Sequence, residues 1–132
     1  MSKGLQFERR VASWLRRMGF SARVRELVRG FRTRRSYEVD VHAIGQKGFI
    51  RKRRIDIWVE CKARKSTVKS RDVYHLIEKA RDLRDACEEG IEDWYPDILM
   101  IVSTAGFDYD AIMVADEYRI YLVHRTGRGY EL

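Results

Sequence analysis

The sequence predicts an α/β fold, a three-layer αβα sandwich with a central mixed β-sheet. Two observations predict it. Helical and strand periodicities alternate along the chain in the order αβββαβαβ, and one late strand is apolar throughout, as in a sheet covered on both faces. A chain of 132 residues has the length of one domain, so we expect residues 1–132 to form a single domain.

The first half of the chain reads as one helix followed by three strands. Apolar residues recur at helical spacing up to Met18, and Gly19 then ends the predicted helix. Residues 20–27 alternate loosely between apolar and polar, which indicates a strand. Two clearer alternations follow over residues 37–44 and 55–62. The segment 46–54 between them is short enough for a hairpin.

The second half of the chain alternates between helices and strands. An apolar stripe at helical spacing runs over residues 73–87, and Gly90 ends that helix. The continuous apolar run 98–102 predicts a strand buried on both faces. A short helix over residues 110–118 and a last strand over 120–123 complete the predicted fold.

Ionisable side chains share one face of the two middle strands. Strict alternation places Val39, Val41 and Ala43 on one face of the first strand and Glu38, Asp40 and His42 on the other. On the second strand, Ile55, Ile57, Val59 and Cys61 form the apolar face, opposite Asp56, Glu60 and Lys62. If the strands pair as a hairpin, Asp40, Glu60 and Lys62 converge. Two carboxylates and the Cys61 backbone carbonyl suit Mg²⁺, and Lys62 is placed to orient a nucleophile or to stabilise the charge that develops on a phosphodiester.

An acid on one strand followed by Glu-x-Lys on the next resembles the PD-(D/E)xK nuclease superfamily, in particular its Mrr-like restriction endonucleases and archaeal Holliday-junction resolvases. The resemblance covers most of the chain, from Glu8 in the first helix to the final strand–turn–helix–strand segment. It implies a restriction-endonuclease-like fold, Mg²⁺ or Mn²⁺ as cofactor, DNA hydrolysis, and a catalytic role for Glu8 beside Asp40, Glu60 and Lys62. Glu60-x-Lys62 itself is closest to the resolvase pattern.

Each of these residues also has a structural interpretation. Glu60 and Lys62 alone would be weak evidence, because Glu-x-Lys also occurs as an edge-strand salt bridge. We expect Asp56 to pair with arginines of the hairpin, and His42 to hydrogen-bond carboxylates rather than to transfer protons. Glu38 is as well explained by solvent exposure as by metal binding, and a helix covering Trp58 explains it better than a stacked nucleotide does.

Positive charge is concentrated in the first part of the chain. Residues 1–71 hold 21 Lys and Arg against 6 Asp and Glu, whereas residues 72–132 hold 6 against 14. A solvated charged surface would mix the signs, so this segregation favours a polyanion, and nucleic acid before a membrane. We expect backbone phosphates of DNA to contact two basic segments, through Arg32, Arg34, Arg35, Lys47, Arg51, Lys52, Arg53 and Arg54.

These observations predict a metal-dependent DNA endonuclease. The alternatives are a non-catalytic nucleic-acid-binding module with a nuclease-like fold and an RNA-processing nuclease. One active site cuts one strand, so we expect a homodimer. The sequence contains no run of 18 apolar residues and no apolar leader, which predicts a cytoplasmic protein without a membrane partner.

Overall fold

The computed structural model describes residues 2–48 and 52–132. Its elements alternate much as the sequence predicts, with boundaries shifted by at most four residues. In chain order they are α1 (Lys3–Arg17), β1 (Ser21–Arg29), β2 (Ser36–Lys47), β3 (Arg53–Lys62), α2 (Ser70–Glu88), β4 (Ile98–Ser103), α3 (Tyr109–Glu117), β5 (Tyr121–Thr126) and β6 (Gly129–Glu131).

The strands form one mixed sheet in the order β1-β2-β3-β4-β5-β6. β1, β2 and β3 pair antiparallel, β3, β4 and β5 pair parallel, and β6 returns antiparallel to β5. The strand β6 corrects the sequence-based prediction, which ended the fold with a strand over residues 120–123. Three residues are too few to show an alternation, so only the pairing with β5 reveals β6.

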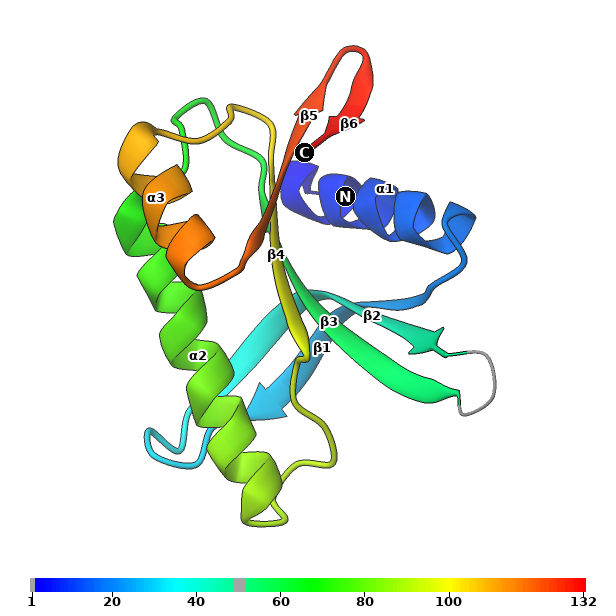
Figure 1. The fold of residues 1–132 in the computed structure, drawn as a ribbon, viewed down its shortest axis with the longest axis vertical. Helices are drawn as coiled ribbons and strands as arrows, with labels where there is room; N and C mark the ends of the chain where they lie inside the picture. The colour runs from blue at the N-terminus through cyan, green and yellow to red at the C-terminus, as the bar shows by residue number, and fades with distance from the viewer. Residues whose placement is uncertain (1, 49–51) are drawn as a thin grey trace.

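The sheet is covered on both faces, which confirms the three-layer sandwich. Figure 1 shows α1 on one side of the strands and α2 with α3 on the other. Phe7, Val11 and Leu15 of α1 pack on one face in a cluster with Val59 of β3, whereas the opposite face packs against α2 and α3. Among the described residues, no helix is long and apolar enough to cross a membrane.

Helix α1 carries an acidic residue on its buried side. Ser2 caps the helix by accepting a hydrogen bond from the Leu5 amide at 3.1 Å, and Gly19 with φ 100° follows its last turn. Glu8 follows Phe7 in the sequence, and both side chains are buried against the sheet. The apolar stripe that docks α1 therefore also fixes the position of the Glu8 carboxylate.

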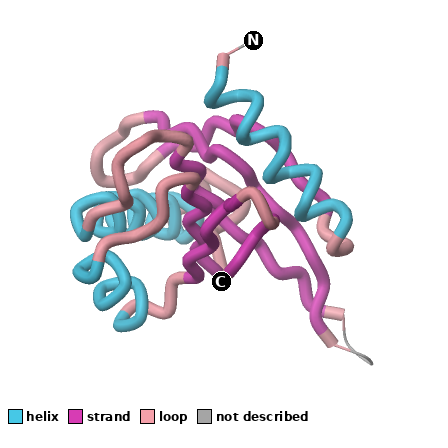
Figure 2. Tube along the Cα trace, turned by 90° about the horizontal axis from the view of Figure 1, so that it is seen from above, coloured by secondary structure: helices cyan, strands magenta, loops and turns pink. Residues whose placement is uncertain are grey.

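The β2–β3 hairpin projects beyond the helices, as both views of the backbone show (Figures 1 and 2). Its strands pair in register from Val41 with Val59 out to Lys47 with Arg53. The basic segment that precedes β2 lies at the other end of this strand. The two predicted DNA-binding segments are thus separated by the 12 residues of β2, or about 40 Å.

Candidate active site

Strands β1 and β2 reverse their pleat at one position, and Asp40 lies there. The neighbouring residues pair in register, Glu26 with Val39 among them, so Arg25 stands opposite Asp40. Arg25 has a φ of 55°, a left-handed conformation that is uncommon for a residue with a side chain. Beyond this point Val39 packs in the cluster under α2, whereas Val41 packs in the cluster under α1.

This reversal corrects the alternation expected along β2. Val39 and Val41 were predicted to share one face, and Glu38 and His42 the other. Instead Val39 joins the face that α2 covers, and Glu38 turns toward Glu8 of α1. The left-handed Arg25 rotates the residues that follow it in β1 to the opposite face of that strand. Because β2 stays paired with β1 in one register on both sides of Asp40, and paired residues share a face, β2 reverses with it.

Three carboxylates gather at the reversal. One ligand oxygen each of Glu8, Glu38 and Asp40 lies within 4.8 Å of the other two. Arg25 holds two of them: its Nε donates to Glu8 Oε1 at 2.7 Å and lies 3.5 Å from Glu38 Oε1. Asp40 Oδ2 accepts the backbone N–H of Cys61 at 2.8 Å, which fixes this carboxylate against β3.

The Glu60 carboxylate lies beside Asp40 and has two lysine partners. The Nζ atom of Lys79 lies 3.1 Å from Glu60 Oε2, and that of Lys62 lies 3.8 Å away. Lys79 comes from α2, and its ammonium also sits 5.8 Å from the centre of the Trp58 ring. Trp58 is fully buried in the cluster that includes α2, as the sequence analysis favoured.

Lys79 is a site residue that the sequence analysis missed. It stands three residues after Leu76 and four before Leu83, two members of the buried stripe of α2. A lysine at a stripe position is a signal, because a partly buried ammonium is stabilised by a carboxylate partner. The sequence does not say which carboxylate lies opposite, since Glu60 is 19 residues away in the chain.

The electrostatics of the group favour a bound cation. Burial of Asp40, followed in size by repulsion from Glu60, raises the pKa of Asp40 to about 8. The Cys61 side chain packs in the cluster under α1, and burial raises the pKa of its thiol, so its side chain is a poor ligand. A site that offers only oxygen donors and an excess of negative charge suits a hard divalent ion.

The structure therefore brings the four predicted catalytic residues together. Glu8 meets Asp40 in the acidic group, Asp40 contacts β3 at Cys61, and Glu60 lies between Asp40 and Lys62. Their roles, and that of the Cys61 carbonyl, stay predictions.

The basic segment before β2 is fastened to α2 by one carboxylate. Asp82 accepts hydrogen bonds from the Arg32 backbone N–H at 2.6 Å and from the Thr33 hydroxyl at 2.7 Å. The Arg32 guanidinium pairs with Asp85 at 2.7 Å, so its charge is already compensated. Arg34 and Arg35 are exposed, and no carboxylate in the described part of the chain pairs with either of them.

The basic segment of the β2–β3 hairpin is partly compensated as well. Arg53 pairs with Asp97 at 3.4 Å and Arg54 with Asp56 at 2.9 Å, the second as expected from sequence. Lys47 and Lys52 are exposed, without a carboxylate partner among the residues described. Arg51, also predicted to contact DNA, lies outside the described residues.

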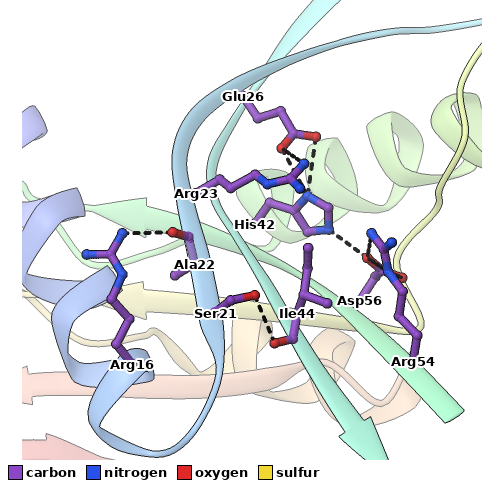
Figure 3. Close-up of polar contacts among 9 residues, drawn as sticks. All are labelled: Arg16, Ser21, Ala22, Arg23, Glu26, His42, Ile44, Arg54 and Asp56. Atoms are coloured by element: carbon purple, nitrogen blue, oxygen red, sulfur yellow. Dashed lines mark hydrogen bonds and ion pairs between the residues drawn. The ribbon is translucent and has the colours of Figure 1, made fainter.

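In a second polar group, around His42 of β2, the side chains pair with one another (Figure 3). His42 is fully buried, with Nδ1 3.2 Å from Glu26 and Nε2 2.7 Å from Asp56. Its ring stacks on Trp94 at 3.5 Å. Since both ring nitrogens have carboxylate partners, the structure places His42 in the hydrogen-bonding role that the sequence analysis preferred.

Comparison with solved structures supports the fold. At a TM-score of 0.69 and 20% identity, 90% of this chain matches 56% of the chain of AF1548, a protein of unknown function. The MspJI restriction endonuclease in complex with a 27-mer oligonucleotide matches 96% of this chain at a TM-score of 0.56 and 18% identity. AspBHI, a DNA modification-dependent restriction endonuclease, matches 91% of it at 0.54 and 17%. The chain spans 56% of AF1548 and only 26% and 28% of the two endonucleases.

Comparison of the sequence with family models identifies its family. Among curated proteins no sequence matches. The model of the restriction endonuclease family Mrr_cat matches residues 1–127, nearly the whole chain. On this match, and with a mixed sheet that brings an acid and a Glu-x-Lys motif together, the chain belongs to the Mrr_cat restriction endonuclease family.

Proposed function

We propose that residues 1–132 act as one metal-dependent nuclease domain that hydrolyses phosphodiester bonds in DNA. The observation that carries the proposal is the crowding of Asp40 against Glu60, with Lys62 beside Glu60, in a chain of the restriction endonuclease family. A fold that only bound phosphates would gain nothing from carboxylates placed where DNA must lie, because they repel phosphates.

The donor set fits Mg²⁺, with Mn²⁺ as an alternative ion. Asp40 and Glu60 would hold the ion through carboxylate oxygens, together with the Cys61 backbone carbonyl, and Glu38 lies near enough to Asp40 to join them. Repulsion between these groups is what raises the pKa of Asp40 beyond the effect of burial, and a cation would relieve it. When bound, such an ion supplies positive charge that offsets the charge developing on the phosphodiester.

The chain's own residues would orient and neutralise the reacting groups. Lys62 has the position to orient the nucleophile or to stabilise negative charge in the transition state, since its ammonium faces the Glu60 carboxylate. Lys79 and Arg25 are positioning residues, because they hold Glu60 and Glu8 respectively. Glu8 would act from the flanking helix through a water molecule or through a second ion.

DNA is the proposed substrate, because one structural relative was solved with an oligonucleotide and another is named a DNA modification-dependent endonuclease. Four of the predicted DNA contacts have no carboxylate partner among the described residues: Arg34, Arg35, Lys47 and Lys52. Three others are already paired with carboxylates and would have to break those ion pairs to bind phosphates: Arg32, Arg53 and Arg54. Cleavage of both strands requires two sites, so we propose a homodimer on DNA. Sedimentation that found only monomer with and without DNA would contradict the dimer.

The decisive experiment is incubation with linear, supercoiled, single-stranded and four-way-junction DNA, with Mg²⁺ and with EDTA. We expect cleavage of at least one DNA form in Mg²⁺ and none in EDTA. Asp40→Asn should abolish it, while Glu117→Gln, the same chemical change at an exposed position on α3, should leave it intact. Cleavage that persisted in EDTA would exclude a metal-dependent reaction. RNA cleavage without DNA cleavage would favour the RNA-processing alternative.

A further inference from the structure

Two basic clefts lie along α1 and meet at Arg10. The first has a volume of about 420 Å³, and its lining includes Lys3, Arg10, Arg64 and Lys65. The second has a volume of about 380 Å³, and its lining residues are Arg9, Arg10, Ser13, Arg17, Arg125 and Tyr130. Neither lining contains a carboxylate among the described residues.

The first cleft adjoins the candidate active site. Its lining residues Ala63 and Arg64 directly follow Lys62 of the Glu-x-Lys motif, and Phe7 directly precedes Glu8. Arg64 pairs with Asp72 of α2, which anchors this wall of the cleft. A polyanion that reaches the site through this cleft therefore continues into the second cleft without crossing negative charge.

Two exposed arginines of α1 differ in their ion pairing from three arginines of the two predicted DNA-binding segments. Arg10 and Arg17 are exposed, and no carboxylate in residues 2–48 and 52–132 pairs with either side chain. Arg32, Arg53 and Arg54, by contrast, all have carboxylate partners. Uncompensated guanidinium groups need not break an ion pair before they bind a phosphate, so Arg10 and Arg17 are better placed to bind one than Arg32, Arg53 and Arg54 are.

The second cleft is built on a rigid support that the sequence analysis did not foresee. Arg125 of β5 lies over the ring of Tyr130 in β6, 4.8 Å from its centre. Tyr130 in turn stacks on Trp14 of α1 at 4.2 Å with an interplanar angle of 12°. Pairing of β5 with β6 thus holds a guanidinium beside the exposed face of α1.

We propose that a DNA backbone bound at the candidate active site runs along α1, with phosphates contacting Arg10, Arg17 and Arg125. This inference rests on the proposed function and names the path of its substrate. Lys3 and Arg17 are separated by 14 residues of helix, or about 21 Å, which corresponds to about six nucleotides of one strand of a duplex. The contacts read phosphates and no bases, so binding is independent of sequence.

The test is the salt dependence of DNA binding, measured by fluorescence anisotropy with a labelled 30-base-pair duplex in EDTA. Each phosphate contact contributes about 0.9 to the slope of log affinity against log salt, so the triple variant Arg10→Gln, Arg17→Gln, Arg125→Gln should lower the slope by about 2.7. The control Arg71→Gln, Arg81→Gln, Arg84→Gln removes the same charge from α2, on the opposite side of the sheet, and should lower it by less than about 1.

A second variant separates lost contacts from lost folding. Arg10→Lys, Arg17→Lys, Arg125→Lys keeps the charge, so the slope should stay within about 0.5 of the original value. Equal slope changes in the Arg10/Arg17/Arg125 glutamine variant and the Arg71/Arg81/Arg84 glutamine variant would overturn the proposed path. So would an unchanged slope in the first of these variants. Binding to vesicles of anionic lipid without binding to DNA would overturn it as well.

Different results would contradict the DNA path along α1 and the proposed nuclease activity. If DNA is cleaved but the Arg10/Arg17/Arg125 glutamine variant keeps the original slope, the path along α1 is wrong and the nuclease proposal stands. If the Arg10/Arg17/Arg125 glutamine variant loses about 2.7 of the slope but no DNA form is cleaved in Mg²⁺, the path stands and the nuclease proposal is wrong.

Discussion

Two groups of carboxylates, one around Asp40 and one around His42, are centred two residues apart on β2, and their electrostatic environments are opposite. Around His42, each charge faces an opposite or titratable partner: Glu26 and Asp56 take the two ring nitrogens, and Arg54 pairs with Asp56 at 2.9 Å. Around Asp40, by contrast, the neighbouring groups are other carboxylates, those of Glu8, Glu38 and Glu60. The nearby cations pair with its neighbours, Arg25 with Glu8 and Lys79 with Glu60.

The difference separates a stabilising network from a candidate reaction site. A balanced group contributes to stability because each buried charge or polar atom has its partner. A crowded group of like charges opposes folding, and here repulsion adds to burial to raise the pKa of Asp40 to about 8. Strongly perturbed carboxylates that are grouped in this way are typical of functional sites, because a bound cation removes the repulsion.

The largest expected effect is on cleavage by variants of the crowded group. Asp40→Ala, Glu60→Ala and Lys62→Ala should each reduce the cleavage rate in Mg²⁺ by about a hundredfold or more, since an ion ligand or a charge stabiliser is lost. Initial rates on the preferred DNA form measure this loss. DNA binding should persist, and should tighten for the two carboxylate variants. Full activity in any one variant would remove that residue from the site.

The matching change in the balanced group should affect stability instead. Asp56→Asn removes the buried carboxylate that His42 Nε2 and Arg54 share, so we expect a decrease of about 2 kcal/mol in the free energy of unfolding. Urea denaturation followed by tryptophan fluorescence measures the change. At temperatures where the variant is folded, cleavage should stay within about threefold of the original rate, which is small beside the loss expected at Asp40. A hundredfold loss of the cleavage rate in Asp56→Asn would show that the group around His42 also contributes to the reaction.

A smaller effect is expected at the edge of the crowded group. Glu8→Gln should reduce cleavage by about tenfold, less than Glu60→Gln does, because Glu8 comes from a flanking helix and is held by Arg25. Single-turnover rates of the two variants in Mg²⁺ give the comparison. Equal losses would place Glu8 among the residues that contact the ion directly.

A further effect is a pH dependence of stability that arises from Asp40 in the crowded group. The folded chain keeps the Asp40 proton up to a pH of about 8, whereas the unfolded chain releases it near 3.8, the ordinary pKa of an aspartate side chain. The free energy of unfolding therefore falls as the pH rises between these values, because the folded state binds more protons. In EDTA, the melting temperature should drop by about 10 °C between pH 5 and pH 8, in excess of the change in Asp40→Asn.

Magnesium provides the complementary measurement. At pH 8 it should raise the melting temperature of the original chain, because it stabilises the deprotonated carboxylates, and it should do so much less in Asp40→Asn. An identical pH profile in the two proteins would show that Asp40 titrates normally. It would also remove the electrostatic difference between the two groups.

Local patterns in the sequence were enough to predict the layers of the fold and the residues of the Glu-x-Lys motif. Helical and strand periodicity are local properties, so Val11 and Leu15 could be assigned to a buried helix face and Glu60 and Lys62 to one face of a strand. The convergence of Asp40 with β3 also followed, because a hairpin between adjacent alternating segments limits the register.

Which charges are neutralised, and where the pleat reverses, depends on how the elements pack together. The left-handed conformation of Arg25 has no local signal in the sequence, yet it marks the position where β1 and its paired strand β2 reverse, with Glu38 near Glu8 and Asp40 at the junction. Lys79 reaches Glu60, and Asp97 reaches Arg53, across 19 and 44 residues of chain. Strand alternation constrains neighbours along the backbone, whereas ion pairing depends on distances of a few ångströms between elements that only packing brings together.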